Sequence, residues 1–481
     1  MTASRVRIIA ISAAATIAVA AIAVTLFGPP ASQDAPLLEG VLSIADDRHS
    51  PAFWLDKLPS SEVPLAEPAS IHAQNQRLVE LDPSLFDLDA LPERLPQARV
   101  LSWITGLAER PDSTLYDVTG ATLSEDQLDA VLENRNLDAI PARAPRQYGL
   151  VVRRADLRSF PTDLRVFRSA DDTNIDRFQE DALFPGTPIV VAHESKDRNW
   201  WFVVSPRYAA WIRKEHVALG DATEVMAYST RSPYRVVTGA TVRTVFTPEL
   251  PAVSELQLDM GVRVPLAGHW PLTEPVNGQN ASGNFVIELP VRNDEGRLRL
   301  APALIQANAD TEPDYLSLTR GNIIRQGFKF LGERYGWGHA YNARDCSGFV
   351  SEVYRSMGVV LPRNTADQSV SPALDKTLFS EADGAEERMQ AIRDLDVGDL
   401  VYIPGHVMMV IGFDDGEPWV IHDTTGATYF DANEQLVRVS LHAVSVTPLL
   451  PLRADEEKSY VDRMTSIVRV ASASAGSQPP P

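Results

Sequence analysis

A single cysteine, Cys346, stands in a chain of 481 residues and limits how that chain can be stabilised. Without a second thiol there is no intrachain disulfide and no multi-cysteine metal site, so packed cores must hold the domains. The hydrophobic content of 44% is ample for such cores. Two roles remain for the cysteine, that of a small buried hydrophobe and that of a nucleophile.

The residues that follow Cys346 favour the nucleophile. Apolar side chains recur at helical spacing after this position, at Phe349, Val350, Val353, Tyr354 and Met357. We therefore expect the cysteine on the first turn of a helix, where unpaired backbone N–H groups and the helix dipole stabilise a thiolate.

A thiolate nucleophile needs a base, and His406 and His422 lie on the two arms of a predicted β-hairpin. A two-residue loop would turn the histidines to opposite faces. A three-residue loop at 414–416 pairs Phe413 with Glu417 and makes the histidines diagonal neighbours on one face. We therefore expect His406 to be the base and His422 to hold its ring.

A metal site is the rival use of this hairpin, with His406, His422, Asp423 and Asp414 as possible ligands. The sequence has no His-Glu-x-x-His motif and no clustered carboxylates there, and a metal would leave Cys346 without a role. No metal and no other cofactor is expected.

Five short stretches carry the residues of this chemistry. They are Tyr-Gly-Trp-Gly at 335–338, Asp-Cys-Ser-Gly-Phe at 345–349, Leu-Pro-Arg at 361–363, Gly-His-Val at 405–407 and Ile-His at 421–422. Together they resemble the motifs of the NlpC-type bacterial cell-wall cysteine peptidases, which have a papain-like fold.

The resemblance implies that Cys346 attacks an amide of the peptidoglycan stem peptide, typically between γ-linked D-glutamate and a diamino acid. It also implies that His406 moves the proton, that His422 orients His406, and that Tyr335 stabilises the oxyanion with the Cys346 N–H. The same motifs add four candidates for substrate contact, Asp345, Ser347, Arg363 and Asn364.

Two positions depart from the family pattern. Many members have glycine where this chain has His339, and this histidine is expected at the rim of the site. Some relatives carry an aspartate at position 364 that binds the free N-terminal amine of the stem peptide, and Asn364 predicts a weaker preference for that amine.

The stretches 148–220 and 221–308 each consist of short apolar strands separated by turn residues. Segment 183–192 is echoed by segment 258–267, which predicts two small β-barrels. They resemble the bacterial SH3-like modules that accompany NlpC-type domains. In such relatives the first barrel can lend a tyrosine to the active site, so Tyr208 is a candidate for substrate contact, with core or rim packing as the alternative.

These patterns predict an α+β multidomain chain. Besides the two barrels, its parts are a signal or anchor segment with linker at 1–36, a helical N-terminal domain at 37–147, a papain-like domain at 309–455 and a tail at 456–481 that is disordered at its end. Within the helical part, Ser124 and Gln127 form a capping-box pattern.

The N-terminus predicts export. Arg5 and Arg7 precede an uncharged apolar run at 8–27, which is long enough to anchor the chain in the inner membrane if it is not cleaved. The body of the chain would then lie in the periplasm or cell envelope. The net charge of −20 argues against nucleic acid as a partner, and the resemblance implies peptidoglycan stem peptides or muropeptides.

The sequence therefore predicts a peptidoglycan endopeptidase with a Cys-His-His site. Two alternatives stay open, a catalytically silent wall-binding scaffold and an amidase or acyl transferase that uses the same cysteine. For the endopeptidase, activity is expected to fall as His406 becomes protonated, between about pH 5 and 8.

Overall fold

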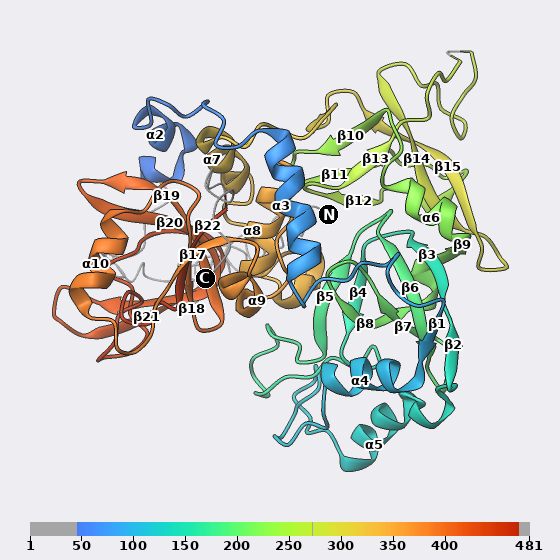
Figure 1. The fold of residues 1–481 in the computed structure, drawn as a ribbon, viewed down its shortest axis with the longest axis horizontal. Coiled ribbons are helices and arrows are strands. Elements are labelled where there is room, and N and C mark those ends of the chain that lie inside the picture. The colour runs from blue at the N-terminus through green and yellow to red at the C-terminus, as the bar shows by residue number, and fades with distance from the viewer. Residues whose placement is uncertain (1–45, 272, 471–481) are drawn as a thin grey trace, which may run out of the picture.

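The computed structural model describes residues 46–271 and 273–470. The predicted anchor at 8–27 and the predicted disordered end of the tail, after Val470, lie outside the described residues. Within the described ranges, no helix combines the length and the apolar character needed to cross a bilayer. Three bodies make up this part of the chain (Figure 1).

A seven-stranded antiparallel sheet forms the first barrel, in the order β5-β4-β8-β7-β6-β3-β9. Its strands are β3 (Gln147–Val151), β4 (Ala155–Arg158), β5 (Gln179–Leu183), β6 (Pro188–Glu194), β7 (Trp200–Val204), β8 (Ala209–Arg213) and β9 (Val217–Gly220). Trp200 and Trp211 are buried in its core, so these aromatic side chains provide packing and not an exposed platform.

The second β-body is built from three short antiparallel sheets around one hydrophobic core. The first sheet contains β10 (Tyr234–Val237), β13 (Arg263–Pro265) and β16 (Thr311–Glu312), the second pairs β11 (Thr241–Arg243) with β12 (Gln257–Asp259), and the third pairs β14 (Asn284–Arg292) with β15 (Leu298–Gln306). Because β12 lies beside the C-terminal body, it can bring charged groups to that interface.

The C-terminal body is a six-stranded sheet in the order β17-β22-β18-β19-β20-β21. Its strands are β17 (Asp375–Leu378), β18 (Leu400–Ile403), β19 (His406–Asp414), β20 (Glu417–Phe430), β21 (Leu436–Pro448) and β22 (Ser466–Arg469), and its helices are α7 (Arg320–Phe328), α8 (Cys346–Arg355), α9 (Thr365–Val370) and α10 (Ala385–Arg393). Strand β22 lies beyond residue 455, where the sequence placed the end of this domain. The alternation of four residues was too short to reveal a strand that pairs with β17 and β18.

The helices of the N-terminal region divide between the other bodies. They are α2 (Pro51–Asp56), α3 (Pro68–Leu81), α4 (Gln97–Leu107) and α5 (Glu125–Asn134), and the predicted capping box of Ser124 and Gln127 is present at α5. Trp54 of α2 packs in the core of the C-terminal body, whereas Val100 of α4 packs in the core of the first barrel. Figure 1 shows α2 beside the C-terminal body and α4 beside the first barrel. The separate helical domain at 37–147 stays a prediction.

The hairpin of β19 and β20 reaches the predicted histidine arrangement by a different route. Its loop has two residues, because Asp414 pairs with Glu417, so the predicted three-residue loop is wrong. A β-bulge within 410–412 shifts the register of the two strands by one residue. On the side of the bulge away from the loop, Met409 therefore pairs with Ile421. A two-residue loop alone would turn the two histidines to opposite faces of the sheet. The one-residue shift at the bulge reverses this, and both histidines therefore share a face.

Candidate active site

Cys346 is the first residue of α8, as predicted, and its side chain is buried. Asp345 caps the helix by accepting a hydrogen bond from the Gly348 N–H at 2.8 Å. Burial, together with the charge of Asp345, raises the pKa of the Cys346 thiol to about 12, although the N–H groups of Val407 and Ser347 act in the opposite direction. The resting form at neutral pH is therefore the thiol and not the expected thiolate, because burial outweighs the helix start.

His406 and His422 are in direct contact. Nε2 of His406 lies 2.8 Å from Nδ1 of His422, and Nε2 of His422 lies 3.0 Å from the hydroxyl oxygen of Thr447. When His422 donates to Thr447 and His406 donates to His422, Nδ1 of His406 keeps a free lone pair. In this tautomer His406 can accept a proton.

Sequence reasoning missed Thr447. It lies on β21 opposite Val420, on the same face of the sheet as His422 two residues further along β20. Only the pairing of β20 with β21 reveals it, and no local signal in the sequence gives that register.

Both histidines are held neutral. Burial lowers the pKa of His406 to about 4, and burial with the nearby charge of His406 lowers the pKa of His422 well below 6.5. Neutral imidazole is the form that a general base requires.

The sulfur and the His406 ring form no hydrogen bond within the described part of the chain. The sulfur lies instead at the N–H of Val407, the residue after His406. Cys346 and Val407 belong to the core between α8 and the sheet, whereas Met408 belongs to the core on the other side. Proton transfer from sulfur to imidazole therefore requires the two side chains to approach further, as catalytic groups do when substrate binds.

Tyr335 and His406 line one cavity of about 400 Å³. Burial, followed by the charges of Cys346 and Asp345, raises the pKa of the Tyr335 hydroxyl well above its usual 10. The hydroxyl therefore stays protonated. It can donate a hydrogen bond to the oxyanion that forms on a substrate carbonyl oxygen when the sulfur attacks the carbonyl carbon.

Arg363 is buried and holds the start of the catalytic helix. Its guanidinium donates to both carboxylate oxygens of Asp345 at 2.8 and 3.2 Å and to the Ser347 hydroxyl at 2.8 Å. It also contacts Asp181 of β5 and Nδ1 of His339. Arg363 is 2% exposed and these contacts are all to groups of the protein itself, so its expected contact with substrate stays a prediction.

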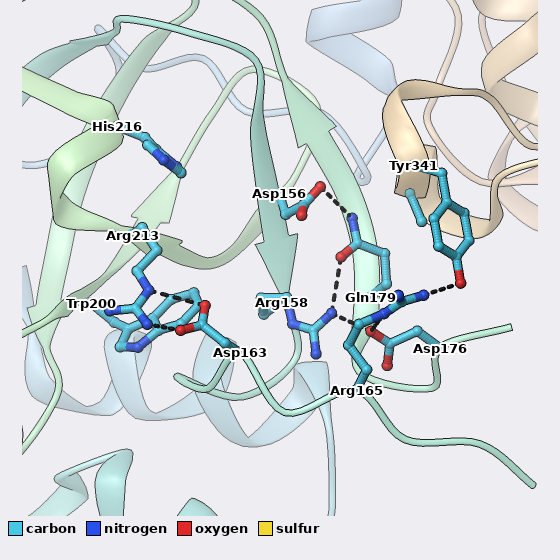
Figure 2. Close-up of a pocket in the computed structure, with 11 residues that line it drawn as sticks. Asp156, Arg158, Asp163, Arg165, Asp176, Gln179, Trp200, Arg213, His216 and Tyr341 are labelled. Carbon is cyan, nitrogen blue, oxygen red and sulfur yellow. Dashed lines mark hydrogen bonds and ion pairs between the residues drawn. The ribbon is translucent and has the colours of Figure 1, made fainter. Parts of the chain in front are cut away.

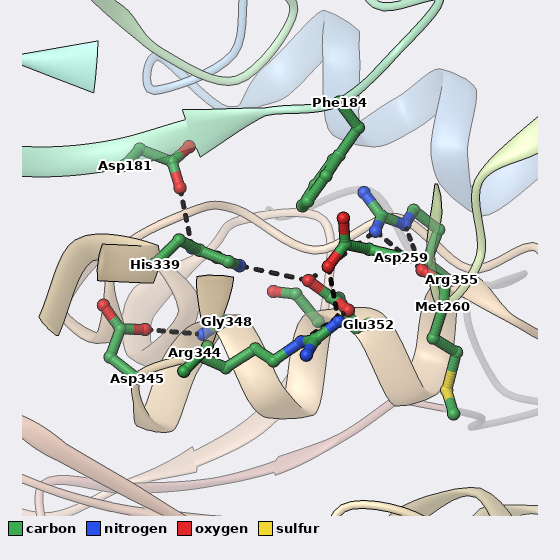
Figure 3. A network of polar contacts seen from close by, with 12 residues as sticks. Asp181, Phe184, Asp259, Met260, His339, Arg344, Asp345, Gly348, Glu352 and Arg355 are labelled. Atoms are coloured by element: carbon green, nitrogen blue, oxygen red, sulfur yellow. Dashed lines mark hydrogen bonds and ion pairs between the residues drawn. The ribbon is translucent and has the colours of Figure 1, made fainter. Parts of the chain in front are cut away.

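His339 is fully buried and does not lie at the rim as expected. Its ring lies between Asp181 and Glu352, at 2.9 and 3.1 Å (Figure 3). Arg344 extends this network by pairing with Glu352 of α8 and with Asp259 of β12. Charged groups from all three bodies thus meet at the helix that carries Cys346.

Tyr208 contacts another residue of the first barrel. Its hydroxyl donates to Glu180 at 2.6 Å, and Glu180 lines a cavity of about 310 Å³ together with Trp337. Burial raises the pKa of Glu180 although the Tyr208 hydrogen bond acts against this. Asn364 is exposed and donates to Asp367 at 3.2 Å, so it does not line this cavity.

A further cavity, of about 350 Å³, lies between the first barrel and the loop that carries Tyr341 (Figure 2). Three arginines and three aspartates line it. Arg158 pairs with Asp176 and Arg213 pairs with Asp163, so most of these charges are already satisfied within the protein. The cavity offers little net charge to an ionic ligand.

Asp414 and Asp423, the carboxylates of the alternative metal site, have other surroundings. Asp414 pairs with Arg48 and Lys57. Asp423 is fully buried without a hydrogen-bond partner among the described residues, and burial with the charge of Asp345 raises its pKa well above 3.8. Over the described ranges, no group of three or more potential metal ligands is present.

Two parts of the chain match known protein families. Residues 332–445 match the NlpC/P60 family, and residues 165–213 match an SH3 domain of the SH3b1 type. A γ-D-glutamyl-L-lysine dipeptidyl-peptidase of Bacillus cereus is 25% identical over 292 residues, which cover 57% of this chain and 76% of the relative.

Among solved structures, an NlpC/P60 endopeptidase from Photobacterium damselae subsp. piscicida is similar with a TM-score of 0.69. The match covers 86% of this chain and 95% of that one at 16% identity, so it concerns the fold.

Proposed function

We propose that this chain, a cell-wall hydrolase of the cysteine peptidase type with an NlpC/P60 domain and SH3 modules, cleaves the stem peptide of peptidoglycan at the bond between γ-linked D-glutamate and a diamino acid. One observation carries the proposal. The sulfur of Cys346 lies at the backbone of β19 next to His406, whose ring is held by His422 at 2.8 Å.

Catalysis would begin when bound substrate brings the sulfur and the His406 ring together. The thiol proton passes to Nδ1 of His406, and the sulfur attacks the amide carbonyl carbon. The hydroxyl of Tyr335 and the N–H of Cys346 donate to the resulting oxyanion. His406 then gives its proton to the leaving amine as the C–N bond breaks, and water hydrolyses the thioester to release the acid and the thiol.

The bond proposed here rests on the motifs around Cys346 and on the activity named for the Bacillus cereus relative. The first barrel supports an acyl-side subsite, because Glu180, which accepts a hydrogen bond from Tyr208, lines a cavity that also contains Trp337. Glu180 could there accept the ammonium group of a stem peptide, if it ionises on contact with that cation. Such a cell-wall substrate implies action at the envelope or outside the cell.

Incubation of the purified chain with defined muropeptides tests the proposed function. Mass spectrometry of the products is expected to show two fragments, one of which ends in D-glutamate with a free γ-carboxylate. The Cys346→Ala variant is the control. No fragments from any muropeptide would contradict the proposal and favour the scaffold, and a new acyl adduct would favour group transfer.

The acid limb of kcat/KM is expected near pH 4 and not near 6.5, because burial lowers the pKa of His406 to about 4. His406 accepts a proton only when neutral, so activity is present above this pKa and is lost below it. A pH–rate profile from about pH 3 to 8 measures the midpoint. A midpoint near 6.5 would show that His406 is solvated in the working enzyme, and it would contradict this prediction.

A further inference from the structure

Asp423 is a buried acid that the proposed mechanism does not use. Its side chain is 0% exposed, and neither carboxyl oxygen has a hydrogen-bond partner within the described ranges, 46–271 and 273–470. A lone carboxylate is very costly to bury, so a group in these surroundings keeps its proton at neutral pH. Asp423 therefore carries no charge in the resting chain.

The position of Asp423 on β20 directs its side chain to the side of the sheet that α8 covers. Side chains alternate along a strand, so Asp423 shares a face with Ile421, and it pairs with Val444 of β21. Ile421 and Val444 belong to the hydrophobic core that also contains Cys346. The acid thus lies on the face of the sheet against which the helix of the sulfur packs.

The elements next to Asp423 carry several ionisable groups. They are Cys346 and Asp345 at the start of α8, Glu333, Tyr335 and Arg344 in the segment that leads to this helix, and His406 and His442 on the neighbouring strands β19 and β21. Among the residues that the structure describes, Arg344 pairs with three other carboxylates and with neither oxygen of Asp423. Burial, followed by the charges of Asp345 and Glu333, raises the pKa of Asp423 well above 3.8.

An ionised Asp423 would oppose the reaction at two places. After burial and the charge of Asp345, the charge of Asp423 is a further cause that raises the pKa of the Cys346 thiol. It acts in the same direction on the hydroxyl of Tyr335, the proposed donor to the oxyanion, after burial and the charges at 345 and 346. Negative charge passes through the sulfur and the carbonyl oxygen during the attack, and a like charge beside both makes that attack slower.

We propose that Asp423 is a proton switch beside the catalytic sulfur: Cys346 reacts only while Asp423 holds its proton, and loss of that proton at alkaline pH stops the reaction. Asp423 acts through Cys346 and not on the substrate. For peptide cleavage the inference rests on the proposed function and deepens it, since His406 then limits activity on the acid side and Asp423 limits it on the alkaline side.

A pH–rate profile of muropeptide cleavage from about pH 5 to 10 tests the switch. Activity is present below the pKa of Asp423 and is lost above it, so kcat/KM of the unaltered chain should fall to about a tenth one pH unit above the midpoint. Asp423→Asn has the shape of the protonated acid and cannot ionise. It should keep most of the neutral rate and lose the alkaline fall. Tyr335 does not cause such a fall, because burial raises the pKa of its hydroxyl well above 10.

Asp399→Asn is the matched control. Asp399 is a buried acid of the same body, 6% exposed, and burial raises its pKa to about 6. It precedes β18 and acts on Tyr354, which lies near the other end of α8. This variant should therefore keep the alkaline fall of the unaltered chain.

Alkylation of Cys346 separates this inference from the proposed function, because it needs no peptide. The thiol loses its proton to solvent, the thiolate sulfur displaces iodide from iodoacetamide, and the chain has no other thiol that could react. The unaltered chain and Asp423→Asn should react at similar rates near about pH 6. At alkaline pH the variant should react about tenfold faster, since a like charge raises the pKa of a neighbouring group by about one unit or more.

Asp423→Ala provides a second neutral side chain, and melting curves identify the variants that are folded. A difference in alkylation without cleavage of any muropeptide would support the switch and contradict the proposed function. An alkaline fall with the same midpoint in both neutral variants would overturn the inference, and so would equal alkylation of all chains over the whole pH range. Folded neutral variants that also lose the neutral rate would overturn it as well, because Asp423 would then do more than hold a proton.

Discussion

Replacement of Cys346 by alanine is expected to lower kcat for muropeptide cleavage about 10⁴-fold or more, because the attacking atom is removed. The sequence contains no second thiol that could take its place. The side chain lies in the main core of the C-terminal body, so a melting curve of the variant must accompany the rate. The expected shift of the melting temperature is small, since alanine is close to cysteine in size.

The two histidines provide a graded control for this result. His406→Gln is expected to approach the loss seen with Cys346→Ala, because His406 moves the proton. His422→Gln can still accept or donate a hydrogen bond at the His406 ring, so its loss of kcat should be smaller. Measurable cleavage by Cys346→Ala at a rate near that of the unaltered chain would refute the nucleophile, and a larger loss for His422→Gln than for His406→Gln would exchange the proposed roles.

The positions of the proposed catalytic groups in the fold could be predicted from sequence because local rules govern them. Helical spacing after Cys346 gave the start of α8, and the face shared by His406 and His422 followed from strand alternation. The loop has two residues and not the predicted three. The two histidines share a face nevertheless, because the β-bulge at 410–412 compensates for the shorter loop. A bulge leaves little trace in a sequence of apolar residues.

The contacts between the three bodies could not be predicted from the sequence. Asp181, Asp259 and Glu352 lie far apart in the chain, and each could be taken for an ordinary exposed carboxylate. Their burial depends on how the first barrel and the second β-body pack against α8, which no local pattern encodes. The same reason explains why His339 was expected at the rim, although it is 0% exposed.

Asp181→Asn is expected to lower kcat about ten- to a hundredfold with little change in KM, because the first barrel positions the catalytic helix through this residue. Asp181 pairs with Arg363, and Arg363 holds both oxygens of Asp345, the cap of α8. Burial alone would raise the pKa of Asp181, but the Arg363 charge and the His339 hydrogen bond lower it, so the group is a carboxylate in the folded chain. Asparagine keeps the shape and removes the charge that orients Arg363.

Asp176→Asn is the matched control. Asp176 is as buried as Asp181 and also pairs with an arginine, Arg158, but that pair lies within the first barrel and does not contact Arg363. Breaking either pair removes one carboxylate from a buried arginine and should cost about 3–5 kcal/mol of stability at most. Both variants should therefore melt earlier, whereas only Asp181→Asn should lose kcat at a temperature where both are folded. An equal loss of kcat in the two variants would mean that the barrel contributes stability alone, and that Asp345 keeps its position at Cys346 without help from Asp181.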